Sequence, residues 1–437
     1  MVDVSTTWRS QFEAQACANA PEWLTSLRAD AFARFTELGF PTRRDEEWRF
    51  TPVSPITETI FTAATQSVSA EEVALAPFTE IGGTRLVFVN GKYAESLSEV
   101  RALPKGAVVV SIAQGFSEHA KTLEAHFGKY VQGENHAFVS LNTAFTQDGA
   151  LVIIPRNATV EDPIHLLYLT VAGDTPTVSH PRTLILAGEN AQVTIAEVYS
   201  GIGEGTTFTN AVTEIVLAPN AVVDHYKVQA ESASAYHVGV QQVQLDRSGN
   251  FTSHNIAIGG ALVRNEANAV LGAEGCECTL NGLYIAGTGQ LIDNHTAIDH
   301  AMPHCNSHEL YKGIIKGKGR GVFNGKIFVR KDAQKTDAKQ TNQTLLLSKE
   351  AQINTKPQLE IFADDVKCTH GATVGQLSEE SLFYLQSRGI GLEEATSLLT
   401  YAFASEVIGR VKIEALRDQI HSALFLQLPI AIRPEEA

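Results

Sequence analysis

The chain has 437 residues, of which 44% are hydrophobic and 19% are charged, and its formal net charge is −15 at pH 7. This composition excludes a wholly disordered chain. It disfavours a general nucleic-acid binder, which needs a basic face to neutralise phosphates, and a protein that docks on an anionic membrane. No apolar run approaches the roughly 18 residues that a membrane-spanning helix needs.

The N-terminal segment and the cysteines predict a cytoplasmic protein. The segment has neither a basic leader followed by an apolar stretch nor an arginine-rich transit composition. The cysteines are odd in number and widely spaced, which favours free thiols in a reducing compartment over a disulfide framework. They are Cys17, Cys276, Cys278, Cys305 and Cys368.

Residues 1–147 are predicted to form a mixed N-terminal domain. Apolar residues recur at helical spacing over 23–38, and a glycine and a proline shortly after them stop the helix. The charged and proline-broken segment 41–56 is typical of a connector. A short strand is expected over 85–90 and a helix over 118–127.

Residues 148–375 are predicted to form a β-helix, because short β-branched runs alternate with Gly, Asn and Asp turns and no long helical pattern interrupts them. Repeats that cannot bury their own apolar faces indicate stacked coils, and a large β-sandwich is the alternative. We expect an irregular extra turn through segment 293–308, where one interval between turns is long. The equivalent turn positions are Ala191, Ala221, Asn250, Cys276, Gly321 and Ala351, at spacings of 30, 29, 26, 45 and 30 residues.

Residues 376–437 are predicted to form a C-terminal helical domain. Apolar residues trace one helix face over 392–407 and a second face over 413–424. Several catalytic signatures are absent from the chain: the phosphate-binding loop, the dinucleotide fingerprint, the nucleophile elbow and the His-Glu-x-x-His motif. If the function needs ATP hydrolysis, a partner must supply it.

Three groups of side chains offer metal-binding chemistry. The richest lies in segment 293–309, where imidazoles and one thiol suit zinc or iron, although histidines on short strands more often bond to backbone carbonyls or cap coils. Its candidate ligands are His295, His300, His304, Cys305 and His308. The second is Cys276 with Cys278, which point to the same face of a strand and are expected to pack in the core.

The third group is Cys368 with His370, two residues apart on an expected strand. The neighbouring Lys367 is expected to lower the pKa of the Cys368 thiol and so favour the thiolate that binds metals. A lone Cys-x-His pair is incomplete for a closed site, which suits a site that another subunit completes. Packing and turn formation are the alternative.

A basic stretch precedes this pair. Segment 311–340 contains nine Lys or Arg and two Asp residues, a local charge of +7. It is either a solvated strand face or a docking surface for an acidic partner or a phosphate-bearing ligand.

Several long blocks of the chain resemble the SufD family, the scaffold subunits of the Suf iron–sulfur cluster assembly system. The longest covers 321–377 and includes VKCTHGATVG, and further blocks are FYLQSRGIGLEEATSLLTYAF at 383–403 and GFPTRRDEEWRFT at 39–51. These blocks are specific and lie in order across most of the chain. The first and last of them resemble SufD more than its paralogue SufB.

The resemblance implies a right-handed parallel β-helix flanked by an N-terminal α/β domain and a C-terminal helical domain. It implies pairing with SufB through the solenoid, and docking of the ABC-type ATPase SufC on residues 376–437. A transient iron–sulfur cluster is expected at the SufB–SufD interface, with His370 as its leading ligand and Cys368 beside it. A reduced flavin is associated with such complexes, but no residue here is assigned to it, and segment 295–308 receives no role.

Three hypotheses follow. The leading one is a non-catalytic scaffold that completes an iron–sulfur site with SufB in a heteromer. A homodimer of the chain alone is a further possible form. The alternative is a zinc or iron enzyme that uses a metal-activated water at segment 295–308. The third is a solenoid that only holds its partners together.

Overall fold

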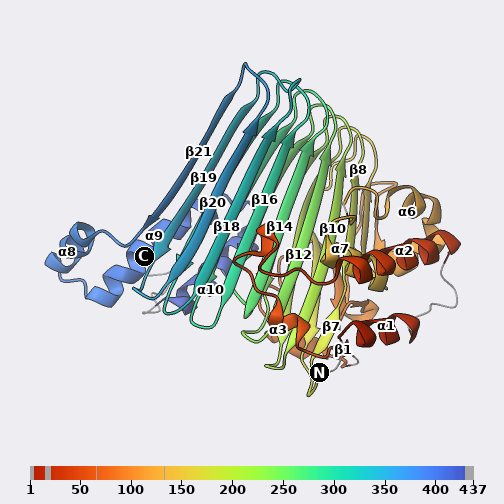
Figure 1. Cartoon of the computed structure of the whole chain (residues 1–437), viewed down its shortest axis with the longest axis horizontal. Coiled ribbons are helices and arrows are strands. Elements are labelled where there is room, and N and C mark those ends of the chain that lie inside the picture. Colours follow the sequence, from red (N-terminus) through yellow and green to blue (C-terminus); the bar gives the residue numbers. More distant parts are fainter. Residues whose placement is uncertain (1–3, 15–20, 65, 132, 429–437) are drawn as a thin grey trace.

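The computed structural model describes residues 4–14, 21–64, 66–131 and 133–428. A long stack of strands runs through the molecule, with the N-terminal helices gathered at one end and α8 projecting from the other (Figure 1). Among the described residues, no helix is long and apolar enough to cross a membrane.

The N-terminal region mixes short helices and strands, as predicted. The expected helix over 23–38 and strand over 85–90 are confirmed by α2 and β2. The helix expected over 118–127 begins earlier and is broken in two, because His119 leaves the helical conformation (φ −128°, ψ 30°). The elements are α1 (Val4–Ala14), α2 (Glu22–Leu38), η1 (Glu46–Trp48), α3 (Ser54–Thr57), β1 (Thr62–Ala63), α4 (Ala70–Leu75), β2 (Thr84–Val89), β3 (Lys92–Tyr93), η2 (Glu95–Leu97), β4 (Val108–Ser111), α5 (Ile112–Glu118), α6 (Ala120–His126) and α7 (Ala137–Phe145).

The central region is a parallel β-solenoid, which confirms the predicted β-helix and excludes the β-sandwich. Sheet A contains β4, β5 and the even-numbered strands from β8 to β20, and sheet B contains β3, β2, β6 and the odd-numbered strands from β9 to β21. The strands are β5 (Gly149–Ile154), β6 (Ile164–Val171), β7 (Thr177–Ser179), β8 (Arg182–Ala187), β9 (Gln192–Ile202), β10 (Thr207–Leu217), β11 (Val222–Ala230), β12 (Tyr236–Leu245), β13 (Asn250–Ala257), β14 (Leu262–Leu271), β15 (Glu277–Ala286), β16 (Leu291–His300), β17 (Asn306–Ile315), β18 (Arg320–Val329), β19 (Asp337–Leu346), β20 (Gln352–Ile361) and β21 (Lys367–Gly375).

The coils repeat more regularly than the sequence suggested. Segment 293–308 forms parts of the ordinary strands β16 and β17, so the irregular extra turn predicted there is wrong. Ala191 and Ala221 precede strands of sheet B, whereas Gly321 lies in β18 and Ala351 precedes β20, both in sheet A. Each coil contains two similar strand-and-turn units, one per sheet. The interval of 45 residues between Cys276 and Gly321 is long because Cys276 precedes a strand of sheet B, whereas Gly321 lies in a strand of sheet A.

The stacked coils share a continuous interior. In sheet A, for example, Ile215, Val243, Ala269 and Ile298 occupy the same position on successive strands, and all are at most 2% exposed. Side chains that repeat in register fill the interior layer by layer, and burying each large one stabilises the fold by roughly 1.5–3 kcal/mol.

The predicted connector over 41–56 packs against the solenoid instead of lying free. We call residues 46–51 the strap, because they cross the outer face of sheet A. The ring of Trp48 lies 3.8 Å from the guanidinium carbon of Arg264, and the Thr51 hydroxyl donates to Asp293. The sequence hid this docking, since the strap's partners lie more than 200 residues later in the chain.

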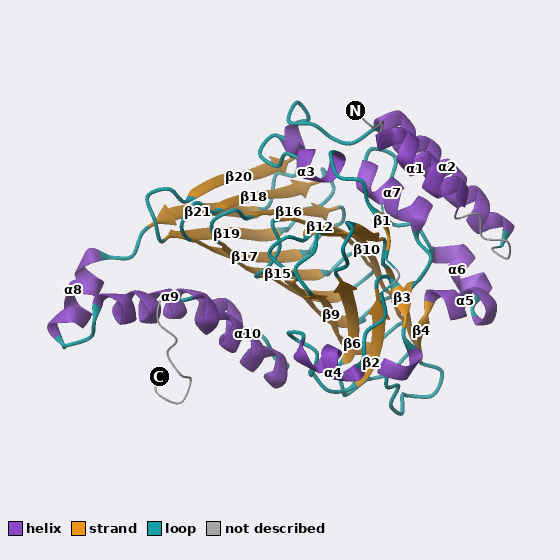
Figure 2. Ribbon diagram, turned by 90° about the horizontal axis from the view of Figure 1, so that it is seen from below, coloured by secondary structure: helices purple, strands orange, loops and turns teal. Residues whose placement is uncertain are grey.

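The last two C-terminal helices lie on the outer face of sheet B, whereas the first projects beyond the end of the sheet (Figure 2). The C-terminal helices are α8 (Glu379–Ser387), α9 (Leu392–Ile408) and α10 (Glu414–Gln427), which confirms both predicted helices. Apolar residues of α9 and α10, including Val407 and Ile420, pack in one cluster with Val228, Ile256 and Leu283 of sheet B.

Candidate functional site

Cys368 and His370 lie on β21, the last strand of sheet B, which pairs only with β19 among the described strands. Cys368 is in register with Ala338 and His370 with Gln340, and both of these partners are buried. Residues paired in register on parallel strands point the same way. Cys368 and His370 therefore continue two interior columns of the solenoid, at the point where no further coil of the described chain covers them.

The two side chains differ in their surroundings. Cys368 is half-buried and packs on an apolar cluster that includes Ile327 and Val329, whereas His370 is exposed. Burial raises the pKa of the Cys368 thiol. The predicted lowering of that pKa by Lys367 is therefore wrong, because neighbouring residues on a strand point to opposite faces and Lys367 lies in solvent.

The end of the solenoid around these residues is open. Neither β20 nor β21 has a partner strand beyond it in the described part of the chain. Large apolar side chains are exposed here: Ile361 (39%), Phe362 (58%) and Val374 (46%). No group of three or more His, Cys, Asp or Glu residues in the described ranges is placed to hold a metal ion. Within these ranges Cys368 and His370 therefore do not by themselves make up a closed metal site.

The histidines of segment 293–308 do not converge, which counts against the metalloenzyme hypothesis. His300 is buried and bonds to the Ser307 hydroxyl at 2.8 Å, while His308 is exposed on β17. His304 has a left-handed backbone (φ 59°) in the turn before β17, as Asn220 has in the turn before β11 (φ 58°). Strand alternation and turn geometry explain these positions without a metal.

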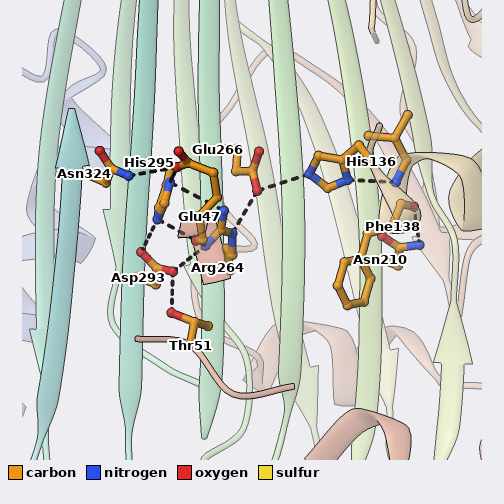
Figure 3. Close-up of polar contacts among 11 residues, drawn as sticks. Glu47, Thr51, His136, Phe138, Asn210, Arg264, Glu266, Asp293, His295 and Asn324 are labelled. Carbon is orange, nitrogen blue, oxygen red and sulfur yellow. Dashed lines mark hydrogen bonds and ion pairs between the residues drawn. The ribbon is translucent and has the colours of Figure 1, made fainter. Parts of the chain in front are cut away.

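His295 instead belongs to a network that joins the strap to sheet A (Figure 3). Its ring nitrogens lie 3.0 Å from Asp293 and 3.3 Å from Glu47 of the strap. Burial and Arg264 oppose the charge of His295, but Asp293 and Glu47 outweigh them and raise its pKa. Arg264 also pairs with Glu266 at 2.8 Å. A cavity of about 480 Å³ opens beside His295, between the strap and β18 and β20.

Sequence reasoning missed this network, although the block GFPTRRDEEWRFT contains Glu47. The signal that was available is local: three acidic residues directly before a tryptophan in a proline-flanked segment. Such a segment has both charges and an aromatic ring to place on a partner surface, but nothing in it identifies that surface.

The cysteine pair at the start of β15, with Cys276 just before the strand and Cys278 in it, is buried as predicted. Cys276 and Cys278 are both buried in the interior core. Cys305 lies in the next coil beside Cys276, and both thiols donate to the carbonyl of Ala273, at 3.2 and 3.1 Å. Burial raises the pKa of the Cys278 thiol well above its usual value. Cys17 lies outside the described residues.

Two lysines of the basic stretch bind the C-terminal helices of the chain itself. Lys312 Nζ donates to the carbonyl of Phe403 at 3.1 Å and pairs with Glu406. Lys316 Nζ donates to the carbonyl of Gln427 at 2.6 Å. The sequence predicted that this stretch is either a solvated strand face or a docking surface for an external partner or ligand. Lys312 and Lys316 fit neither prediction, because both contact helices of the same chain.

Comparison with known proteins matches nearly the whole chain. Residues 7–166 match the family model described as the SufBD protein N-terminal region, and residues 168–403 match the SUF system FeS cluster assembly, SufBD core domain. An iron–sulfur cluster assembly SufBD family protein of Synechocystis is 36% identical, over 92% of this chain and 90% of the relative.

Two relatives carry the name iron–sulfur cluster assembly protein SufD. The one from Escherichia coli is 32% identical and covers 97% of this chain and 96% of its own length. The one from Bacillus subtilis is 27% identical over 92% of this chain and 94% of its own length. Because the core model alone spans more than half of the chain, and full-length relatives agree with it, this protein belongs to the SufBD family of the SUF iron–sulfur cluster assembly system and is SufD-like.

Proposed function

We propose that the chain is a non-catalytic scaffold subunit that builds part of a nascent iron–sulfur cluster site together with a SufB-like paralogue. The observation that carries the proposal is the open end of the solenoid, where Cys368 and His370 continue interior columns that no coil closes. The proposal places this work in the cytoplasm, as the cysteine usage led us to expect.

Exposed strand edges support pairing with a second solenoid. Unpaired N–H and C=O groups of β20 and β21 would invite uncontrolled association unless another chain or element covered them. A SufB-like solenoid has the matching architecture in the family resemblance, and a second copy of this chain is the alternative partner. Either one would also bury Ile361, Phe362 and Val374.

The cluster is the cargo of this interface. His370 is the first ligand we assign, because its imidazole is exposed. Histidine binds metals as the neutral ring, whereas cysteine must first become a thiolate. Cys368 comes second, since burial raises the pKa of its thiol and disfavours the thiolate. The SufB-like partner supplies the remaining ligands. We assign no residue of this chain to a flavin.

The C-terminal region, residues 376–437, is proposed to dock a SufC-like ATPase, which supplies the ATP hydrolysis whose motifs this chain lacks. Exposed apolar and aromatic side chains gather on α8 and at the start of α9: Phe383 (73%), Tyr384 (57%) and Leu392 (54%). Such residues on projecting helices favour a protein partner.

Substitution of His370 tests the cluster site. In a complex co-expressed with SufB-like and SufC-like partners, His370→Ala should leave assembly of the subunits intact and reduce the iron and sulfide content after anaerobic reconstitution at least tenfold. His308→Ala is the matched control, because His308 is exposed on the outer face of β17 and should have no effect.

Two other results would contradict the proposal. Normal iron and sulfide content in a double variant of Cys368 and His370 would favour a solenoid that only holds partners together. Stoichiometric, tightly bound zinc in the purified single chain would favour the metalloenzyme.

A further inference from the structure

Three side chains form one interior column beneath the proposed cluster ligand. His370 of β21, Gln340 of β19 and Glu309 of β17 occupy the same register position on successive strands of sheet B. Neighbouring strands lie about 4.8 Å apart, and in-register side chains share a face. Gln340 is 2% and Glu309 3% exposed, so two polar groups lie in the solenoid interior directly behind His370.

Only one end of the Gln340 amide has a hydrogen-bond partner among the described residues. Gln340 Nε2 donates to Glu309 Oε2 at 2.8 Å. This bond orients the amide while Glu309 is ionised, because only the nitrogen can donate to a carboxylate. The other amide atom, Oε1 of Gln340, is buried and has no hydrogen-bond partner among the described residues. A buried acceptor without a donor costs free energy, and the next residue in the column with a ring N–H is His370.

The space around Gln340 is kept open for it. Gly325 of β18 faces it across the coil, and a Cβ on Gly325 would overlap the amide group of Gln340. Burial raises the pKa of Glu309 to about 7, and the bond from Gln340 opposes that rise. The Nε2 end of the amide therefore donates to Glu309 and lies where only a glycine at position 325 leaves room for it.

We propose that Gln340 is a positioning residue for His370: anchored by Glu309, it presents Oε1 to one ring N–H of His370 and leaves the other ring nitrogen to the cluster. This inference rests on the proposed function of His370. Histidines that bind metals commonly donate their second N–H to such an acceptor, which sets the tautomer and the ring orientation.

The test compares variants in the full complex by iron and sulfide content and by cluster absorbance after anaerobic reconstitution. Gln340→Met preserves length but removes the acceptor, and it should lower cluster yield about tenfold with subunit assembly unchanged. The control is Gln343→Met, because Gln343 lies on the same strand and faces outward. The reciprocal double variant Glu309→Gln with Gln340→Glu keeps an amide–carboxylate pair and an acceptor facing His370, so it should restore most of the yield.

Each outcome decides a separate question. If Gln340→Met stays within twofold of wild type while His370→Ala loses the cluster, the positioning role is wrong and the proposed function stands. If His370→Ala itself behaves as wild type, the proposed function fails. If Gln340→Met does not assemble, the double variant decides: an assembled complex with low yield overturns the positioning role, and one with near-normal yield supports it.

Discussion

At the scale of single residues, several buried charges in this solenoid form ion pairs with residues of a neighbouring coil. Arg182 and Glu214, both fully buried, form an ion pair. Arg264 pairs with Asp293 at 2.8 Å and lies under the strap's Trp48 ring. Removing one member of such a pair leaves an uncompensated buried charge. Arg264 also donates to the backbone carbonyl of Glu47, so the same guanidinium helps to hold the strap.

We expect the contribution of His295 to the attachment of the strap to depend on pH. Its pKa is raised in the folded protein, so its protonated form adds stability that is fully present below about pH 6.5 and is lost as the pH rises through the folded-state value. We expect His295→Gln to lower the free energy of unfolding more at pH 6 than at pH 9, as measured by denaturant unfolding at both values. The contributions of groups that titrate alike in both proteins cancel when the free energies of unfolding of wild type and variant are subtracted. An equal loss at both pH values would contradict the role of protonation.

At the scale of elements, the C-terminal helices hold to sheet B through apolar packing and through lysines that bind backbone carbonyls. Lys316 donates to the carbonyl of Gln427, the last residue of α10. The final carbonyls of a helix have no partner within the helix and carry its negative dipole end. Lys316, in the turn after β17, therefore caps the C-terminal end of α10.

Lys316→Met should loosen α10 selectively. The lost cap should reduce the local free energy of opening by about 1 kcal/mol. The measurement is amide hydrogen exchange, which should become faster in residues 414–427 and stay unchanged in α2. Lys318→Met is the control, because Lys318 is 66% exposed on the same turn and pairs only with the exposed Glu350. Unchanged exchange in α10 would show that packing alone holds it.

At the scale of the whole molecule, the two ends of the solenoid are treated differently. The N-terminal end is covered by β4 and by the helices around it, whereas β20 and β21 end without a covering element in the described chain (Figures 1 and 2). An edge with exposed large apolar side chains is a binding surface when a partner covers it and an aggregation risk when none does.

Phe362→Lys should therefore weaken subunit pairing. Phe362 is 58% exposed in the turn between β20 and β21, and an aromatic residue at the centre of an interface commonly contributes enough for at least a tenfold change in Kd. Affinity for the SufB-like partner is measured by titration with the purified full-length chains. Leu75→Lys is the control, because Leu75 is 87% exposed at the end of α4, away from β20 and β21, and should not alter binding. Unchanged affinity of the Phe362 variant would place the interface elsewhere.

Patterns that depend on neighbours in the chain were read correctly from the sequence. The helices α2, α9 and α10 follow from apolar spacing, and the solenoid follows from short β-branched runs separated by turn residues. The inward direction of Cys276 and Cys278 follows from strand alternation. These features arise within a few residues, so local spacing contains the information.

Features that depend on which coil lies on which were decided only by the tertiary structure. The sequence did not show that Gly321 belongs to sheet A and Ala221 to the turns of sheet B, since both half-coils have similar patterns. It did not show that Glu47 reaches His295, or that Gln340 lies behind His370. Composition, spacing and motif by themselves determined the solenoid and the C-terminal helices, and they made Cys368 and His370 candidate ligands. Stacking alone determined the neighbours of that pair, because parallel coils bring together residues about 30 positions apart that no local pattern connects.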